Sequence, residues 1–261
     1  MNFSQFFGLF IFLMYFCTTR TGNVAVVAEV NSETDFVAKN ETFQEFVQTV
    51  ADTALASGLN GGANGEDIDA LLATNGLSEL LVEKTATIGE KLSVRRFAKV
   101  TGDVVTSYIH GGGRIGVIIA ANGATDDAAK EAITNIAMQV AAMSPKYVSR
   151  DEVDASFLEH EKEILLAQIQ NDPKESQKPE KVIQGMINGR INKEMKEICL
   201  LDQVYVKAED GKQSVAKYLD EVGKANGTTI TLKKFVRFET GEGLEKKNED
   251  FAAEVAAQMN A

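Results

Sequence analysis

Two segments of the chain carry the same order of apolar and polar positions. Each begins with an apolar run typical of a buried strand, at residues 24–30 and 115–121, and continues through a polar turn into an amphipathic helix. The helices have apolar residues at i, i+3, i+4 and i+7, namely Phe43, Phe46, Val47 and Val50 in the first, and Ile133, Ile136, Ala137 and Val140 in the second. The pattern predicts two similar strand–turn–helix units.

The two units align without a gap when Gly22 is placed over Gly113. Identical residues then coincide at Asn31 and Asn122, Thr34 and Thr125, Asp35 and Asp126, Ala38 and Ala129, and Lys39 and Lys130. An internal repeat of this kind predicts an α+β fold, with two related subdomains in which small antiparallel sheets pack against helices.

The copies differ in the turn, where Phe36 in the first corresponds to Asp127 in the second. If packing within the repeat needed an aromatic ring, both copies would be expected to have an apolar residue there. One interpretation is that Phe36 contacts something outside its own fold. The other is that it fills a local hole, since a single Phe usually belongs to a core.

The rest of the chain supplies the remaining elements. A Gly/Asn loop at 60–66 precedes two short helices, and residues 91–121 are typical of two or three strands with a tight turn at Gly111–Gly113. Further on, two helical stretches flank a loop with two prolines, and the narrow apolar stripe of the second is typical of a projecting antiparallel coiled coil. That stripe is Ile183, Ile187, Ile191 and Ile198. A helix at 214–225, a strand at 229–240 and a last helix at 249–259 follow.

This organisation predicts a first core subdomain at 21–100 and a second at 101–261, interrupted by the helical hairpin at about 155–200. Residues 1–20 are set apart as an atypical apolar leader. Their apolar run is shorter than the roughly 20 residues of a membrane-spanning helix, and it has neither the basic start nor the cleavage site of a secretory signal. A weak signal or anchor and a misassigned chain start are the two readings of it.

Charge and cysteine content narrow the classes of partner. The net charge is -11 over 261 residues, and no concentrated basic patch is visible, which disfavours binding to nucleic acid through phosphates. Small molecules or other proteins are the expected partners. Cys17 and Cys199 do not suggest a disulfide framework, so a reducing compartment is expected. The two cysteines and two histidines lack the spacing of a metal site.

Catalytic motifs are sparse. Gly111, Gly113 and Gly116 formally match the dinucleotide motif G-x-G-x-x-G, but they lie between predicted strands instead of between a strand and a helix. The sequence contains no P-loop and no G-x-S-x-G motif. His110, beside the glycines, could serve as a general base or as a binding contact.

The stretch EVNSETDFVAKN closely resembles the signature of the elongation factor Ts family, guanine-nucleotide exchange factors for the GTPase elongation factor Tu. The resemblance continues through IGEKLSVRRF, GDVVTSYIHGGGRIGV, IAMQVAAMSPKYV, MINGRINK and VRFETGEGLEKKNEDFAAEVAAQM, from about Gly22 to the C-terminus. It implies two related α+β subdomains with a helical hairpin inserted in the second. It also implies a cytoplasmic protein without covalent chemistry, cofactor, metal, nucleic acid or membrane as part of its action.

By position, the resemblance implies that Asp35 and Phe36 press into the GTP-binding domain of elongation factor Tu near its Mg²⁺ and phosphates, so that GDP leaves. The further partner contacts that it implies are Thr34, Ile88, Gly89, His110 and Val206. The oligomeric state is left open, and a homodimer within a heterotetramer is one arrangement that the sequence allows.

Two departures from the family pattern keep an alternative open. Family members usually begin with a small three-helix domain, where this chain has the apolar leader, and Gln203-Val204-Tyr205 stands where Gln-Pro-Phe is common. The alternative is a truncated relative that binds its partner with weak or no exchange activity. A third hypothesis is a small-molecule enzyme that uses the glycine turn and His110.

Overall fold

The computed structural model describes residues 13–123 and 125–243, and in this part of the chain six strands form two antiparallel sheets. The first sheet has the order β1-β2-β3, with β1 (Leu13–Thr21), β2 (Val24–Ser32) and β3 (Ser93–Thr101). The second has the order β4-β5-β6, with β4 (Val104–His110), β5 (Ile115–Asn122) and β6 (Thr231–Glu239).

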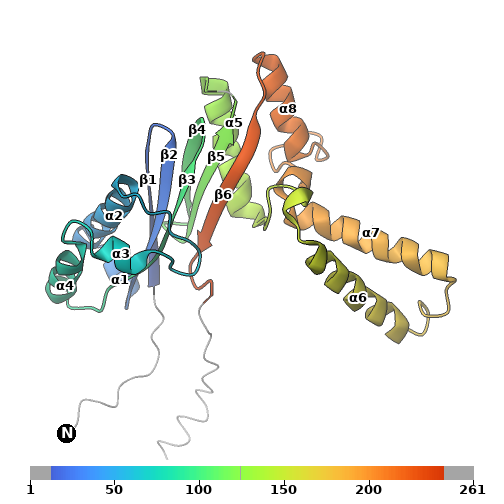
Figure 1. Ribbon diagram of the computed structural model, residues 1–261, viewed down its shortest axis with the longest axis horizontal. Coiled ribbons are helices and arrows are strands. Elements are labelled where there is room, and N and C mark those ends of the chain that lie inside the picture. Colours follow the sequence, from blue (N-terminus) through green and yellow to red (C-terminus); the bar gives the residue numbers. More distant parts are fainter. Residues whose placement is uncertain (1–12, 124, 244–261) are drawn as a thin grey trace, which may run out of the picture.

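The helices are distributed between the two sheets and a projecting arm (Figure 1). They are α1 (Asp35–Ala38), α2 (Glu41–Ala56), α3 (Ile68–Leu72), α4 (Leu77–Ile88), α5 (Asp127–Met143), α6 (Ala155–Asn171), α7 (Glu180–Ile198) and α8 (Val215–Ala225). Short 3-10 turns at Arg150–Glu152 and Leu200–Asp202 flank the arm. The expected α+β class with two small antiparallel sheets is confirmed.

The sheets pack face to face, and helices cover the outer face of each. All residues of β2 after the first are buried, because both faces of the strand are covered. Ala25 and Val27 point to the second sheet, and Val26 and Ala28 point to the α2 side. On β5, Ile118 meets the first sheet in the same way. The result is a layer order of helices, sheet, sheet and helices (Figure 1).

The repeat predicted from the sequence matches the structure. In both units a long helix, α2 or α5, comes after the central strand and lies on the outer face of its own sheet, and in the first unit the short helix α1 comes between them. The eight stripe residues of the two helices are all buried, as their spacing predicted.

The segment set aside as a leader enters the fold in part. Leu13–Thr21 pairs along the whole length of β2, and the ring of Phe16 is buried between the sheets against Phe238. The apolar run suggested a leader, but its last two residues pack on opposite faces of the strand, Phe16 toward the second sheet and Cys17 against the core on the α2 side. Residues 1–12 lie outside the described part of the chain, as does the predicted last helix at 249–259.

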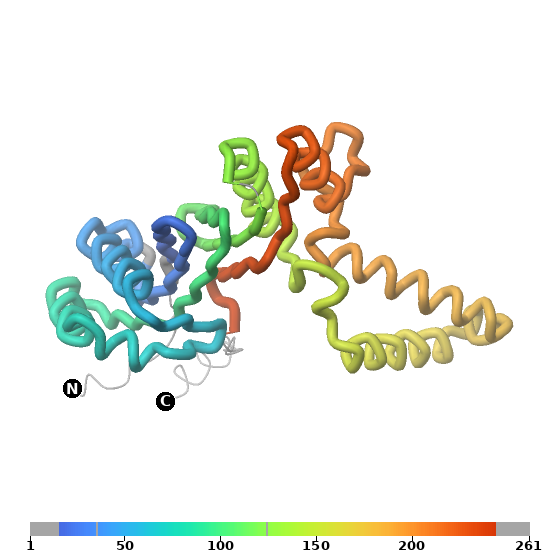
Figure 2. Tube along the Cα trace, turned by 45° about the horizontal axis from the view of Figure 1, so that its top comes forward, coloured from blue at the N-terminus to red at the C-terminus, as the bar shows by residue number. Residues whose placement is uncertain are grey.

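The helical hairpin projects from the sheet-and-helix body, as predicted (Figure 2). Its base is a small apolar cluster in which Met195 and Cys199 are buried. Near its far end, Arg190 of α7 donates to Glu175 in the connecting loop at 2.7 Å. The hairpin therefore has packing of its own at its base and an ion pair near its far end.

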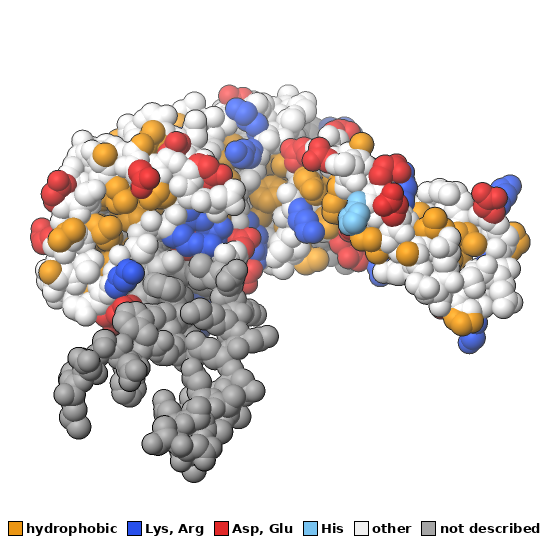
Figure 3. Space-filling view, turned by 60° about the horizontal axis from the view of Figure 1, so that its bottom comes forward, with side chains coloured by type: hydrophobic (Ala, Val, Ile, Leu, Met, Phe, Trp, Pro, Cys, Tyr) orange, Lys and Arg blue, Asp and Glu red, His pale blue; other side chains and the backbone are white. Residues whose placement is uncertain are grey.

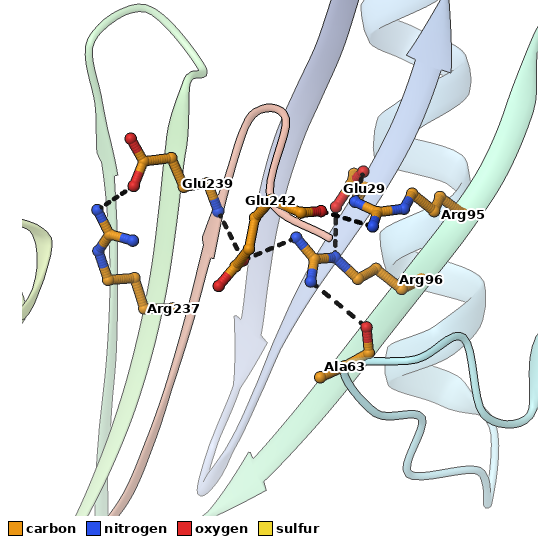
Figure 4. A network of polar contacts seen from close by, with 7 residues as sticks. All are labelled: Glu29, Ala63, Arg95, Arg96, Arg237, Glu239 and Glu242. Carbon is orange, nitrogen blue, oxygen red and sulfur yellow. Dashed lines mark hydrogen bonds and ion pairs between the residues drawn. The ribbon is translucent and has the colours of Figure 1, made fainter. Parts of the chain in front are cut away.

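A buried ion network joins the first sheet to the chain after β6 (Figure 4). Glu29 of β2 is fully buried and accepts hydrogen bonds from Arg95 at 2.8 Å and from Arg96 at 2.5 Å. Arg96 also pairs with Glu242 at 3.0 Å and lies over the ring of Phe238. This network fixes the start of the C-terminal segment against the sheet.

Neither a membrane-spanning helix nor a metal-binding group of side chains occurs among the described residues. None of the helices found there has the length and apolar character that crossing a membrane requires. Within the same residues, no group of three or more His, Cys, Asp or Glu side chains is arranged to hold a metal ion.

Candidate functional site

The turn after β2 presents the ring of Phe36 to solvent. Asp35 and Phe36 are the first two residues of α1, a single helical turn of 4 residues. Phe36 has 79% of its surface exposed, the largest fraction among the exposed large apolar residues of the described chain. The interpretation that Phe36 fills a local hole is therefore wrong, because no hole encloses the ring.

Glu90 holds the start of this turn from a distant part of the sequence. One of its carboxylate oxygens accepts hydrogen bonds from the backbone N–H groups of Glu33 at 3.1 Å and Thr34 at 2.9 Å. The other accepts one from the Thr34 hydroxyl at 2.6 Å. From the other side, the Ser32 hydroxyl donates to the Thr34 carbonyl at 3.1 Å.

The end of the turn is fixed by burial and by a helix cap. Val37 is buried in the core of the first subdomain, which anchors α1 on its inner side and leaves Phe36 outside. The helical conformation is then interrupted at Lys39 and Asn40. The Asn40 side chain caps α2 by accepting a hydrogen bond from the Phe43 N–H. In the second repeat no such break occurs, and α5 runs on from its cap at Asp126.

Ile88 and Gly89 lie beside the turn because they immediately precede Glu90. Ile88 ends α4 and is half-buried against the first core. Gly89 adopts a φ of 79°, the left-handed conformation that ends many helices and that glycine adopts without strain. This conformation turns the chain so that Glu90 reaches Thr34. The structure thus brings Thr34, Phe36, Ile88 and Gly89 together.

His110 lies at the same end of the molecule but on the second sheet. It ends β4 before the Gly111–Gly113 turn, and its Nδ1 lies 3.0 Å from the hydroxyl of Tyr108. The carbonyl of Gly113 accepts a hydrogen bond from the N–H of Phe16 in β1. Phe16 is three residues from Leu13, which pairs with Ser32 at the end of β2, so this turn lies at the same end of the sheets as the Phe36 turn. The glycines join two paired antiparallel strands, which is the context that the sequence predicted for them.

Val206 belongs to a separate surface, beyond α5. It is half-exposed, as are Val204 and Met143. The buried side chain of Gln139 orders this loop, accepting from the Val206 N–H at 2.8 Å and donating to the Val204 carbonyl at 3.0 Å. The structure does not bring Val206 to the Phe36 turn.

Two residues that order these surfaces were missed by sequence reasoning. Glu90 follows Ile88-Gly89 directly, but nothing in the local pattern indicates a bond to a residue 56 positions away. Gln139 interrupts the apolar face of α5, and a polar residue on a buried stripe was the one signal that could have indicated it.

On the face shown in Figure 3, apolar side chains reach the surface over both the body and the hairpin.

Comparison with known proteins gives a consistent result. Residues 33–242 match the family model described as elongation factor TS. The chain is 49% identical over 243 residues to elongation factor Ts of Clostridioides difficile strain 630, covering 90% of this chain and 76% of that protein. It is 44% identical over 253 residues to elongation factor Ts of Trichlorobacter lovleyi, covering 92% and 78%.

Proposed function

Since the chain belongs to the elongation factor Ts family, we propose that it binds the GTPase elongation factor Tu and promotes release of GDP by inserting Asp35 and Phe36 near the Mg²⁺ and phosphate site of that partner. The chain acts through binding and contributes no covalent chemistry. The observation that carries the proposal is the exposed ring of Phe36 on a turn that is held on both sides.

An exposed aromatic ring on an ordered turn has the properties that a wedge needs. An aromatic side chain buries about 150–250 Å² when it inserts and has few rotatable bonds to restrict. It stabilises only the partner conformation that has opened to receive it, so it favours the nucleotide-free state. By linkage, GDP must weaken the binding of this chain by the same factor by which the chain weakens GDP.

The remaining contacts lie on two surfaces of the chain. Ile88 and Gly89 lie beside the wedge, and His110 occupies the same end of the molecule. Val206, on the separate surface beyond α5, reaches a different domain of the partner. Contacts on two surfaces keep the partner bound while the wedge acts on its nucleotide site.

Three organisational features belong to this proposal. The core subdomains span 21–100 and 101–261, with the hairpin as an insertion in the second. The protein works in the cytoplasm, where its partner works. A homodimer within a heterotetramer is the assembly proposed for the complex, and native mass spectrometry of the chain with its partner measures it.

The proposal is tested with elongation factor Tu loaded with a fluorescent GDP. Adding the chain should accelerate GDP release, and Phe36→Ala should reduce the acceleration at least about 30-fold, since loss of a central aromatic contact costs about 2 kcal/mol or more. The matched control is Val82→Ala, which shortens another apolar side chain that is 69% exposed. Both variants should unfold at the temperature of the unaltered chain, because neither side chain is packed.

The outcome separates the alternatives. Tight binding without faster release supports a relative that binds but does not exchange. Binding of a nucleotide to the isolated chain supports a small-molecule enzyme instead. Equal loss in Phe36→Ala and Val82→Ala contradicts the wedge.

A further inference from the structure

We infer that Glu90 is a positioning residue that holds the Phe36 turn in its exposed geometry before a partner binds. The inference rests on the proposed function of that turn and names the side chain on which its geometry depends. In this role Glu90 acts through its hydrogen bonds to Glu33 and Thr34.

The contacts of Glu90 concentrate on the residues that enter α1. One carboxylate accepts from two consecutive backbone N–H groups and from a hydroxyl, at 2.6 to 3.1 Å. Hydrogen bonds to an ionised carboxylate are about twice as strong as neutral ones. Because Phe36 itself has little packing, these bonds and the burial of Val37 hold the backbone from which its ring projects.

The two repeats show that this bonding is not needed to begin a helix. In the second repeat, Asp126 caps α5 locally, with its carboxylate accepting from the Ala129 N–H at 2.9 Å. In the first, Thr34 is the N-cap residue of α1 but makes no cap bond with its own side chain. Its hydroxyl donates to Glu90 instead. The start of α1 is therefore bonded to another segment, whereas the start of α5 is capped locally.

That tie joins two parts of the proposed interface. Glu90 directly follows Ile88 and Gly89, so its carboxylate connects their segment to the one that carries Phe36. A turn ordered in the free protein has little conformational freedom left to lose on binding. Without Glu90, the turn would have to be ordered at the moment of insertion.

The test compares Glu90→Ala with Glu83→Ala, a control that removes an exposed carboxylate from the neighbouring helix α4. In the GDP-release assay, Glu90→Ala should lower the maximal rate at saturating chain by about 10-fold, equivalent to about 1.4 kcal/mol. The affinity of the chain for its partner should change less than the rate, because the substitution leaves the Val206 surface unaltered. Glu90→Gln, which keeps one oxygen acceptor, should recover part of the rate.

Amide hydrogen exchange of the free chain supplies a readout that does not depend on the partner. The N–H groups of Lys39 and Asn40 donate to the carbonyls of Phe36 and Val37 within the turn. In Glu90→Ala they should exchange at least about 10-fold faster if the turn opens more often, while amides in α2 keep their rates.

Each result bears on the inference. Unchanged maximal rate and unchanged amide exchange in Glu90→Ala overturn it, even if Phe36→Ala abolishes exchange. If the unaltered chain does not accelerate GDP release, the proposed function fails, and the amide measurement alone decides whether Glu90 holds the turn. Should Glu90→Ala lower the unfolding temperature, Glu90→Gln, which retains the side-chain volume, takes its place in both measurements, and the Lys39 and Asn40 amides should still exchange faster than in the unaltered chain.

Discussion

Replacing Glu29 with alanine should destabilise the protein more than any loss of a surface charge. Glu29 is fully buried in β2 and pairs with two arginines, of which Arg96 has only 4% of its side chain exposed. In the Ala variant Arg96 stays buried and keeps an ion pair only with the carboxylate of Glu242, whose side chain is 48% exposed. The variant therefore creates an undercompensated buried charge.

The magnitude follows from this burial. Breaking a buried ion pair by removing one partner costs about 3–5 kcal/mol, mostly because a desolvated charge remains. For a protein of this size each kcal/mol lowers the unfolding midpoint by about 2–4 °C, so the expected loss is roughly 6–20 °C. Glu29→Gln should lose less, since its amide oxygen still accepts from one arginine.

Thermal unfolding followed by circular dichroism measures the effect. The control is Glu159→Ala, which breaks an exposed pair with Lys162 on the hairpin and should shift the midpoint by less than about 3 °C. The double variant Glu29→Met with Arg96→Met should regain much of the loss, because it removes the two most buried charges of the network and leaves Arg95, whose side chain is 20% exposed. The reasoning is refuted if Glu29→Ala and Glu159→Ala shift the midpoint equally, or if the double variant is less stable than Glu29→Ala.

Two further predictions concern packing and thiol chemistry. Gly116→Ala would place a Cβ 2.9 Å from both Phe16 Cβ and Val27 Cγ2 between the sheets, so it should cost about 1–3 kcal/mol in urea unfolding, and an unchanged midpoint would contradict the close approach. Burial, with the nearby Asp52 carboxylate as the second cause, raises the pKa of the Cys17 thiol to about 11. Because the thiolate is the nucleophile, alkylation of Cys17, measured by mass spectrometry, should stay slow at pH 8 and become faster toward pH 11. Asp52→Asn should speed the alkylation at pH 9. An alkylation rate that levels off below pH 9 would count against the raised pKa.

The local pattern was enough to predict most elements of the body, with the exception of β1 and α1. The apolar spacing of residues such as Phe43 and Ile133 depends only on helix geometry, and the structure buries both. The similarity of the two repeats was likewise predicted by comparing two short segments of the sequence with each other. Helix and strand periodicity are properties of neighbouring residues, so they can be recognised without knowing the fold.

The tertiary structure decided the features that depend on distant residues. Leu13–Thr21 is a strand because β2 supplies its hydrogen bonds and the second sheet covers Phe16. Phe36 is exposed because Glu90 and Val37 hold its turn from outside and inside, although a Phe in sequence is most often a core residue. Periodicity carries no information about which remote carboxylate will meet which backbone N–H, so the geometry of the candidate site is a property of the folded chain alone.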